Sequence, residues 1–229
     1  MSLRIFILLF SVNVYCQTNF VKVNYSLNIG YDEGFSKNSV LKDYIAMAER
    51  GAKFVNFDLE ANKTASYFKL KESVQNQDTE FAISFATAST SYFTEANSNE
   101  KIKYVNDNFG EYRISYHDKT EWKLESETKK IDGYLCYKAT SEQTVVNPKG
   151  TFKHPIVAWY CPAIPFSFGP NGYSGLPGLI LELQVRNITW GATRIELSKE
   201  HKAIEKPTKG KAITSEEYDK ILSSSRIFR

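Results

Sequence analysis

The stretch from residue 169 to residue 185 constrains the fold most, because it sets a turn and then directs a strand. Its hexapeptide, Gly175-Leu176-Pro177-Gly178-Leu179-Ile180, places a proline of fixed φ between two permissive glycines. The residues that follow alternate with the period of a half-buried strand, with Leu179, Leu181, Leu183 and Val185 on one face and Ile180, Glu182, Gln184 and Arg186 on the other. We expect this loop to aim a core strand, or in addition to touch a ligand or partner.

Segments with strand character follow one another along most of the chain, which holds 14 Tyr and 15 Phe. These residue types favour strands over helices. The patterns predict strands at 21–31, 54–60, 65–71, 81–87, 101–106, 111–117, 121–127, 133–146, 151–161, 178–187 and 190–198. Because sequential strands with short turns usually pair, the simplest arrangement is one long antiparallel meander that twists and curls.

Two helices are expected beside these strands. The first runs from about residue 39 to 50, with Asn38 as its N-cap and Gly51 as its stop. The second covers residues 215–224, after the capping-box spacing of Thr214 and Glu217. We therefore predict a mainly β fold of the α+β type: a curved antiparallel sheet or half-barrel wrapped around one amphipathic helix, with a short C-terminal helix.

Two cysteines lie in a hairpin expected around Asn147-Pro148-Lys149-Gly150. If Asn147 pairs with Gly150, Cys136 faces Cys161 at a non-hydrogen-bonded site, where Cα atoms are about 4.5 Å apart and a disulfide fits. The bond would close a loop of about 26 residues and contribute about 3 kcal/mol. A type I turn with Gly150 in a bulge would slip the register by one residue and leave two separate buried thiols.

The first sixteen residues have the pattern of a secretory signal. Arg4 precedes an apolar run at residues 5–10, and cleavage is expected after Cys16. This run is shorter than the about 20 residues that span a bilayer, and no other segment predicts a span. Acylation of Cys16 is an alternative, although residues 13–15 lack the small residues of such signals. Residues 17–229 are expected to form a single exported domain in the periplasm or cell envelope.

Charge and motifs argue against several function classes. The chain has 29 Lys plus Arg and 26 Asp plus Glu, a balance that disfavours nucleic acid as a partner. His117, His154 and His201 are scattered without the spacing of metal ligands, and no serine lies in a Gly-x-Ser-x-Gly elbow. We expect no catalytic residue, metal or cofactor, and no enzyme activity.

An aromatic cluster surrounds the loop before the hexapeptide. Such residues commonly line apolar pockets or contact partners, or they cover the open edge of a sheet. The candidate patch consists of Trp159, Tyr160, Phe166, Phe168 and Tyr173.

The hexapeptide resembles the signature of the GLPGLI family. The likeness extends to Trp122-Lys123-Leu124, Ile131-Asp132-Gly133-Tyr134, Cys136, Ala139, Ala158-Trp159-Tyr160, Ile164-Pro165 and Gly169-Pro170. The resemblance implies an exported bacterial protein of a family without an established activity. By analogy alone, the predicted topology is also similar to that of periplasmic lipoprotein carriers and their lipid-binding relatives.

Two functions of different class follow. In the first, the protein is a periplasmic binding or carrier module whose concave sheet holds an apolar small molecule or lipid, which predicts a large apolar cavity. In the second, it is an envelope interaction module with a filled core that docks on another envelope protein through an exposed apolar patch.

Overall fold

A computed structural model describes residues 18–32, 41–71, 76–98, 100–147 and 150–226. The strands are β1 (Phe20–Ile29), β2 (Asn56–Asn62), β3 (Ala65–Leu70), β4 (Ser91–Glu95), β5 (Glu100–Asp107), β6 (Gly110–His117), β7 (Lys123–Ile131), β8 (Tyr134–Asn147), β9 (Gly150–Cys161), β10 (Leu179–Val185), β11 (Ile188–Ser198) and β12 (Lys211–Thr214). The helices are α2 (Leu41–Ala52), α3 (Gln77–Phe85) and α4 (Ser215–Arg226), with a single 3-10 turn, η1 (Pro170–Gly172). The predicted signal region and Cys16 lie outside the described residues.

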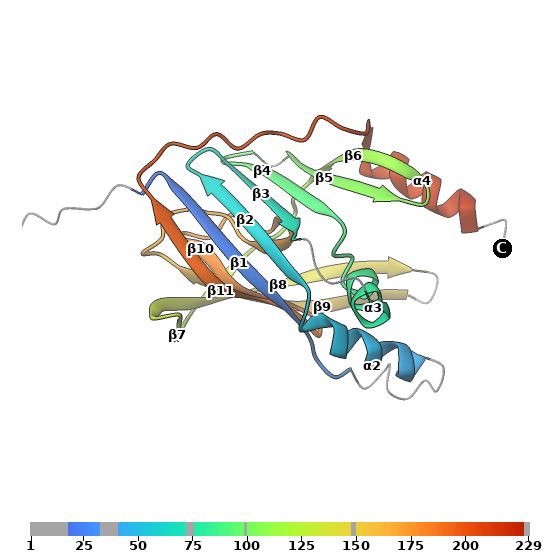
Figure 1. The fold of residues 1–229 in the computed structure, drawn as a ribbon, viewed down its shortest axis with the longest axis horizontal. Helices are drawn as coiled ribbons and strands as arrows, with labels where there is room; N and C mark the ends of the chain where they lie inside the picture. The colour runs from blue at the N-terminus through green and yellow to red at the C-terminus, as the bar shows by residue number, and fades with distance from the viewer. Residues whose placement is uncertain (1–17, 33–40, 72–75, 99, 148–149, 227–229) are drawn as a thin grey trace, which may run out of the picture.

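The twelve strands of the described residues form one sheet in the order β12-β6-β5-β4-β3-β2-β1-β11-β10-β9-β8-β7. Figure 1 shows its overall arrangement. Its ladders are antiparallel except for the parallel pair of β12 and β6. The prediction of a mainly β fold with a short C-terminal helix is confirmed. The prediction of one continuous meander is wrong, because β1 pairs with β11 from Phe20↔Ser198 to Ile29↔Ile188 and joins two separate meanders.

The connection between β6 and β7 requires the sheet to curl. These strands are consecutive in the sequence but stand ten strand positions apart in the sheet. A flat sheet would separate them by about 48 Å, at about 4.8 Å per strand. Residues 118–122, which link them, reach only about 20 Å when fully extended. The two ends of the open sheet are therefore brought towards each other, and the crossing segment 118–122 bridges them.

The interior of the curled sheet is filled with apolar side chains. Aromatic rings of β2 and β3 stack there, with 5.0 Å between the centroids of Phe57 and Phe68. Tyr25 of β1 donates a hydrogen bond of 2.6 Å from its hydroxyl to the carbonyl of Ile180 on β10. The same cluster includes Val21, Val23, Leu59, Ile164, Phe166, Phe168, Leu176, Leu179, Leu181 and Leu183.

The strand predicted after the hexapeptide exists as β10, with one irregularity. Its register against β9 shifts between Ile180 and Glu182. Ile180, predicted to share the polar face, is buried along with Leu179 and Leu181. The loop before β10 covers it, because a Cβ atom at Gly169 would lie 2.6 Å from the Ile180 side chain. Regular alternation of buried and exposed residues begins only after the bulge.

Helix α2 extends one residue beyond its predicted stop, and its predicted cap, Asn38, lies outside the described residues. It packs against α3 at one end of the sheet (Figure 1). A Cβ atom at Gly51 would lie 1.9 Å from the carbonyl oxygen of Asp78, so glycine allows the two backbones to touch. Arg50 also binds Asp78 through two hydrogen bonds, of 2.9 and 3.0 Å.

The prediction of a strand at 81–87 is wrong, because α3 occupies this region. Asn76 caps the helix by accepting a hydrogen bond from the Thr79 amide at 2.9 Å, and the Thr79 hydroxyl accepts from the Asn76 amide at 3.0 Å. This capping box satisfies amides that the start of a helix otherwise leaves unpaired.

The C-terminal part of the chain forms a second small cluster. Residues 199–210 cross from β11 to β12 along the sheet (Figure 1). Tyr218 and Ile213 then pack with Val105 and Ile114. The capping box predicted before α4 is confirmed, since the Glu217 amide donates to the Thr214 hydroxyl at 3.2 Å. Within the described residues, no helix combines the length and apolarity that a membrane span needs.

Candidate functional site

Residues 162–178, here called the motif loop, connect β9 to β10 and fold back as a narrow hairpin. Phe168 and Ser174 form an isolated antiparallel bridge. The loop is also paired to the start of β10, because the Leu179 and Ile180 amides donate to the carbonyls of Ile164 and Phe168, both at 3.0 Å. Backbone hydrogen bonds therefore hold the loop in one conformation.

Gly172 and Gly178 of this loop combine a positive φ with a site where no side chain fits. At Gly172, φ is +77°, and a Cβ atom would lie 2.6 Å from the ring of Tyr92 and 2.7 Å from the hydroxyl of Tyr116. At Gly178, φ is +153°, and a Cβ atom would lie 2.3 Å from the carbonyl oxygen of Cys161. The tip of the loop thus packs directly on β4 and β6, while its end packs on β9.

A buried ion pair attaches the loop tip to the other half of the sheet. Lys101 of β5 keeps only 2% of its side chain exposed, forms an ion pair with Asp118, and donates a hydrogen bond of 2.6 Å to the Gly172 carbonyl. Burial lowers the pKa of Lys101, although the Asp118 carboxylate opposes this shift. Burial also tends to raise the pKa of Asp118, but its bonds to Lys101 and Thr120 outweigh this and lower it.

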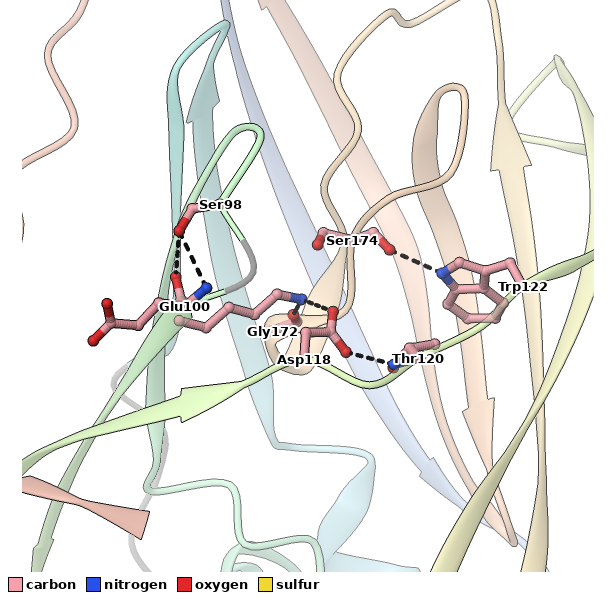
Figure 2. A network of polar contacts seen from close by, with 8 residues as sticks. Ser98, Glu100, Asp118, Thr120, Trp122, Gly172 and Ser174 are labelled. Carbon is pink, nitrogen blue, oxygen red and sulfur yellow. Dashed lines mark hydrogen bonds and ion pairs between the residues drawn. The ribbon is translucent and has the colours of Figure 1, made fainter.

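Trp122 provides a second attachment, as Figure 2 shows. Its indole nitrogen donates a hydrogen bond of 2.8 Å to the carbonyl of Ser174. Its ring lies 6.1 Å from that of Tyr173, centroid to centroid. Asp118 accepts a further hydrogen bond of 2.9 Å from the Thr120 amide. The crossing segment is consequently joined to the motif loop directly through Trp122, and indirectly through Lys101, which binds both Asp118 and the Gly172 carbonyl.

An open pocket of about 720 Å³ lies between the motif loop, the crossing segment and the turn after β4. The pocket wall mixes polar and apolar side chains. Its charged and polar members are Asn62, Lys63, Glu95, Asn97, Ser98, Asp118, Thr120, Ser167 and Ser174. The remaining lining residues are Ala96, Trp122, Leu124, Pro165, Phe166, Phe168, Gly175, Leu176 and Pro177. Because Phe166, Phe168 and Leu176 are at most 2% exposed, the accessible wall is more polar than this membership suggests.

The aromatic patch predicted from the sequence does not form one exposed surface. Tyr160, Phe166 and Phe168 are buried in the core. Trp159 is partly exposed and lies next to Tyr160 on β9, so it faces the opposite side of the sheet, where Lys129 lies 4.5 Å from its ring centroid. Tyr173 is half-buried beside Trp122. These side chains mainly fill the core and support the loop.

The hexapeptide itself divides between the core and the pocket. Leu176, Leu179 and Ile180 are buried, whereas Gly175 and Pro177 are exposed at the pocket rim. The sequence did not single out Lys101 or Asp118, and it assigned no role to Trp122. An alternating lysine in a strand predicts a solvated face, so nothing local marked Lys101 as buried.

The register predicted for the cysteine hairpin is confirmed. The β8–β9 ladder runs from Asn147↔Gly150 to Tyr137↔Tyr160 without a shift, so Cys136 and Cys161 occupy the next facing positions. The slipped register is therefore wrong. Both residues are buried free thiols in this structure. In the part of the chain that the structure describes, no three His, Cys, Asp or Glu side chains are grouped as metal ligands.

Comparisons with known proteins identify the fold and a short family match. Residues 149–182, which include the hexapeptide, match a family described as "Protein of unknown function (Porph_ging)". No curated protein sequence matches the chain. Two solved structures of PNGF-II, in different space groups, are similar to this chain with TM-scores of 0.55 and 0.56, at 16% and 17% identity over 91% of its length. The chain spans about a third of those structures, 34% and 33%. At such identities the likeness is one of fold alone.

Proposed function

We propose that this protein is an exported, non-catalytic binding module of the GLPGLI type that holds a small hydrogen-bonding ligand in the pocket beside the motif loop. The observation that carries the proposal is the pocket itself: its volume of about 720 Å³ is that of a small-molecule site, and fixed segments form its wall. Residues 1–16 are its secretion signal, and residues 17–229 act in the periplasm or cell envelope.

The pocket lining favours a polar ligand over the apolar one expected from the sequence. A carrier of acyl chains needs a large apolar cavity, whereas apolar side chains fill the interior of this curled sheet. The accessible wall instead presents groups that hydrogen-bond, such as Glu95, Asn97 and Ser167, beside the flat ring of Trp122. This combination suits a molecule rich in hydroxyl or amide groups, with one apolar face against the indole.

The charge state of Asp118 suits binding more than proton transfer. Its lowered pKa keeps the carboxylate ionised at neutral pH, and Lys101 and Thr120 hold both oxygens in place. Such a group is a fixed acceptor. The PNGF-II likeness supports the fold, the family match covers the motif loop, and neither names a ligand for this chain.

The test is native mass spectrometry on protein purified from its own producing cells, followed by chloroform–methanol extraction. A bound small molecule that partitions into the aqueous phase is expected. Ser167→Trp, on the exposed pocket wall, should abolish the bound mass, whereas Ser126→Trp, on exposed β7, should retain it. A ligand recovered in the organic phase, or one retained equally by both variants, would overturn the proposal. Sequencing of the exported protein should begin at Gln17.

A second candidate is the envelope interaction module. The filled core favours it, as do two large apolar side chains outside the pocket, Tyr44 at 49% and Phe54 at 56% exposed. A photo-cross-linking residue at position 54 should then capture one envelope protein in intact cells, and the same probe at Ser126 should not. If the probe captures no defined protein from position 54, this candidate fails.

A further inference from the structure

Cys136 and Cys161 form a pair of facing thiols at the end of the β8–β9 ladder. Each side chain is fully buried, and the two thiols lie close enough to shift each other's pKa. The ladder beside them is regular to Tyr137↔Tyr160, so the next position places their side chains on the same face. Facing residues of an antiparallel pair meet the Cα separation that a disulfide requires.

The two thiols are not equivalent. The hydrogen bond from Cys136, together with the backbone amides of Ala163 and Ile164, lowers the pKa of Cys161. The same bond to Cys161, with burial, raises the pKa of Cys136. Cys161 is therefore the sulfur that ionises first, and the thiolate is the form that attacks a disulfide.

Cys161 also lies at the base of the motif loop. The loop begins at the next residue, and Leu179 pairs with Cys161 where the loop ends. Gly178 packs so closely there that a Cβ atom would lie 2.3 Å from the Cys161 carbonyl oxygen. A covalent bond from Cys161 to β8 would consequently fasten both ends of the loop to a third strand.

We propose that Cys136 and Cys161 close an intrachain disulfide when the protein meets a disulfide oxidant, and that this bond clamps the base of the motif loop. The reduced structure described above is the precursor of that bond. The proposal is independent of the proposed ligand, because it concerns only the two sulfurs and the loop they anchor.

The reaction is thiol–disulfide exchange with an exogenous disulfide, such as oxidised glutathione. The Cys161 thiolate attacks one sulfur of the oxidant, the oxidant's S–S bond breaks, and one thiolate leaves. Cys136 then gives its proton to solvent and attacks the sulfur of Cys161, which expels the second thiolate. Two electrons pass from the cysteines to the oxidant. Because both side chains are buried in the folded protein, the oxidant reaches Cys161 when the end of the hairpin opens locally.

The test uses the full chain, refolded either with oxidised glutathione or with dithiothreitol. After denaturation, alkylation and digestion, the oxidised sample should yield a cross-linked peptide pair containing Cys136 and Cys161. The reduced sample should yield Cys136 and Cys161 in separate peptides, both alkylated. The oxidised form should melt about 10 °C higher, as expected for a loop of this length. Amide hydrogen exchange in residues 162–178 should slow at least about tenfold.

The control is Cys136→Ser, which should melt at the same temperature under both conditions. Alkylation of both thiols after denaturation of the oxidised sample would overturn the disulfide, as would a bond from either residue to Cys16. A disulfide that leaves hydrogen exchange of the loop unchanged would overturn the clamp while preserving the bond.

Discussion

Replacing Asp118 by Asn tests whether the Lys101–Asp118 pair fixes the motif loop. The substitution preserves shape but leaves the ammonium of Lys101, only 2% exposed, with no opposite charge. Removing one partner of a buried ion pair lowers the free energy of unfolding by about 3–5 kcal/mol. Because Asp118 is 20% exposed, we expect a loss of about 3 kcal/mol here. For a chain of this size the melting temperature should fall by about 6–12 °C.

Lys101→Met is the matched variant. It removes the more deeply buried charge and leaves Asp118, which is 20% exposed and keeps its hydrogen bond from the Thr120 amide. The main loss is therefore the hydrogen bond to the Gly172 carbonyl, about 1–2 kcal/mol. The double variant Lys101→Met/Asp118→Asn should be no less stable than Asp118→Asn alone, because it contains no unpaired ammonium. Urea unfolding of the four proteins measures these differences as a double-mutant cycle.

The pH dependence provides an independent check. Wild-type Asp118 has a lowered pKa, so its contribution is complete above about 3.9 and is lost as the pH falls through the lower folded value. In Asp118→Asn, Lys101 loses the charge that supported its pKa. The resulting loss of folding stability is complete below the lowered pKa of Lys101 in the folded variant. It disappears as the pH rises to about 10.4, where Lys101 is neutral in both the folded and the unfolded state. Equal losses in both single variants, with no recovery at high pH, would refute the reasoning.

Two further predictions concern glycines. Gly172→Ala should lower the free energy of unfolding in urea by about 3 kcal/mol, because the new Cβ would lie 2.6 Å from Tyr92. Gly175→Ala also has a positive φ, of +90°, but should lower it by only about 1 kcal/mol, because the nearest neighbour, Trp122, is 4.0 Å away. Gly51→Ala should cost about 3 kcal/mol and accelerate hydrogen exchange in α2 and α3, since its Cβ would lie 1.9 Å from the backbone of residue 78. Wild-type stability of Gly172→Ala or Gly51→Ala would contradict the close packing at that position.

Local patterns predicted most strands, but they failed where two signals competed. Residues 81–87 alternate as Phe81, Ile83 and Phe85 around smaller side chains, which indicates a strand. The helix forms because Asn76 and Thr79 cap it and acidic residues occupy its first turn. The capping signal was present in the sequence, and it outweighed a short alternation that a nine-residue helix also accommodates.

The hairpin register was predictable because it depends on nearby residues. A turn at Asn147 and Gly150 determines every facing pair back to Cys136 and Cys161. The pairing of β1 with β11 has no comparable signal, since it joins strands at opposite ends of the chain. Any apolar strand could pair with the free edge of β1, and only the complete fold determines that β11 does so.

The candidate site was predictable in part for the same reason. The hexapeptide is contiguous, so its turn and strand could be inferred from its glycines, proline and alternating residues. The pocket and the Lys101–Asp118 pair combine segments from β5, the crossing segment and the motif loop. Such a combination depends on the curl of the sheet, which no local pattern encodes.

The pairing of β1 with β11 also determines the order in which this protein can fold. Each of the two meanders contains contacts between strands that are close in sequence, so each can form early. The contact of Phe20 with Ser198 instead requires closure of a loop that includes nearly the whole chain, at a high entropic cost. During synthesis one edge of β1 therefore stays unpaired until β11 has been made. A chain with β1 at the centre of its sheet thus acquires its central pairing only after the strands of both meanders have been made.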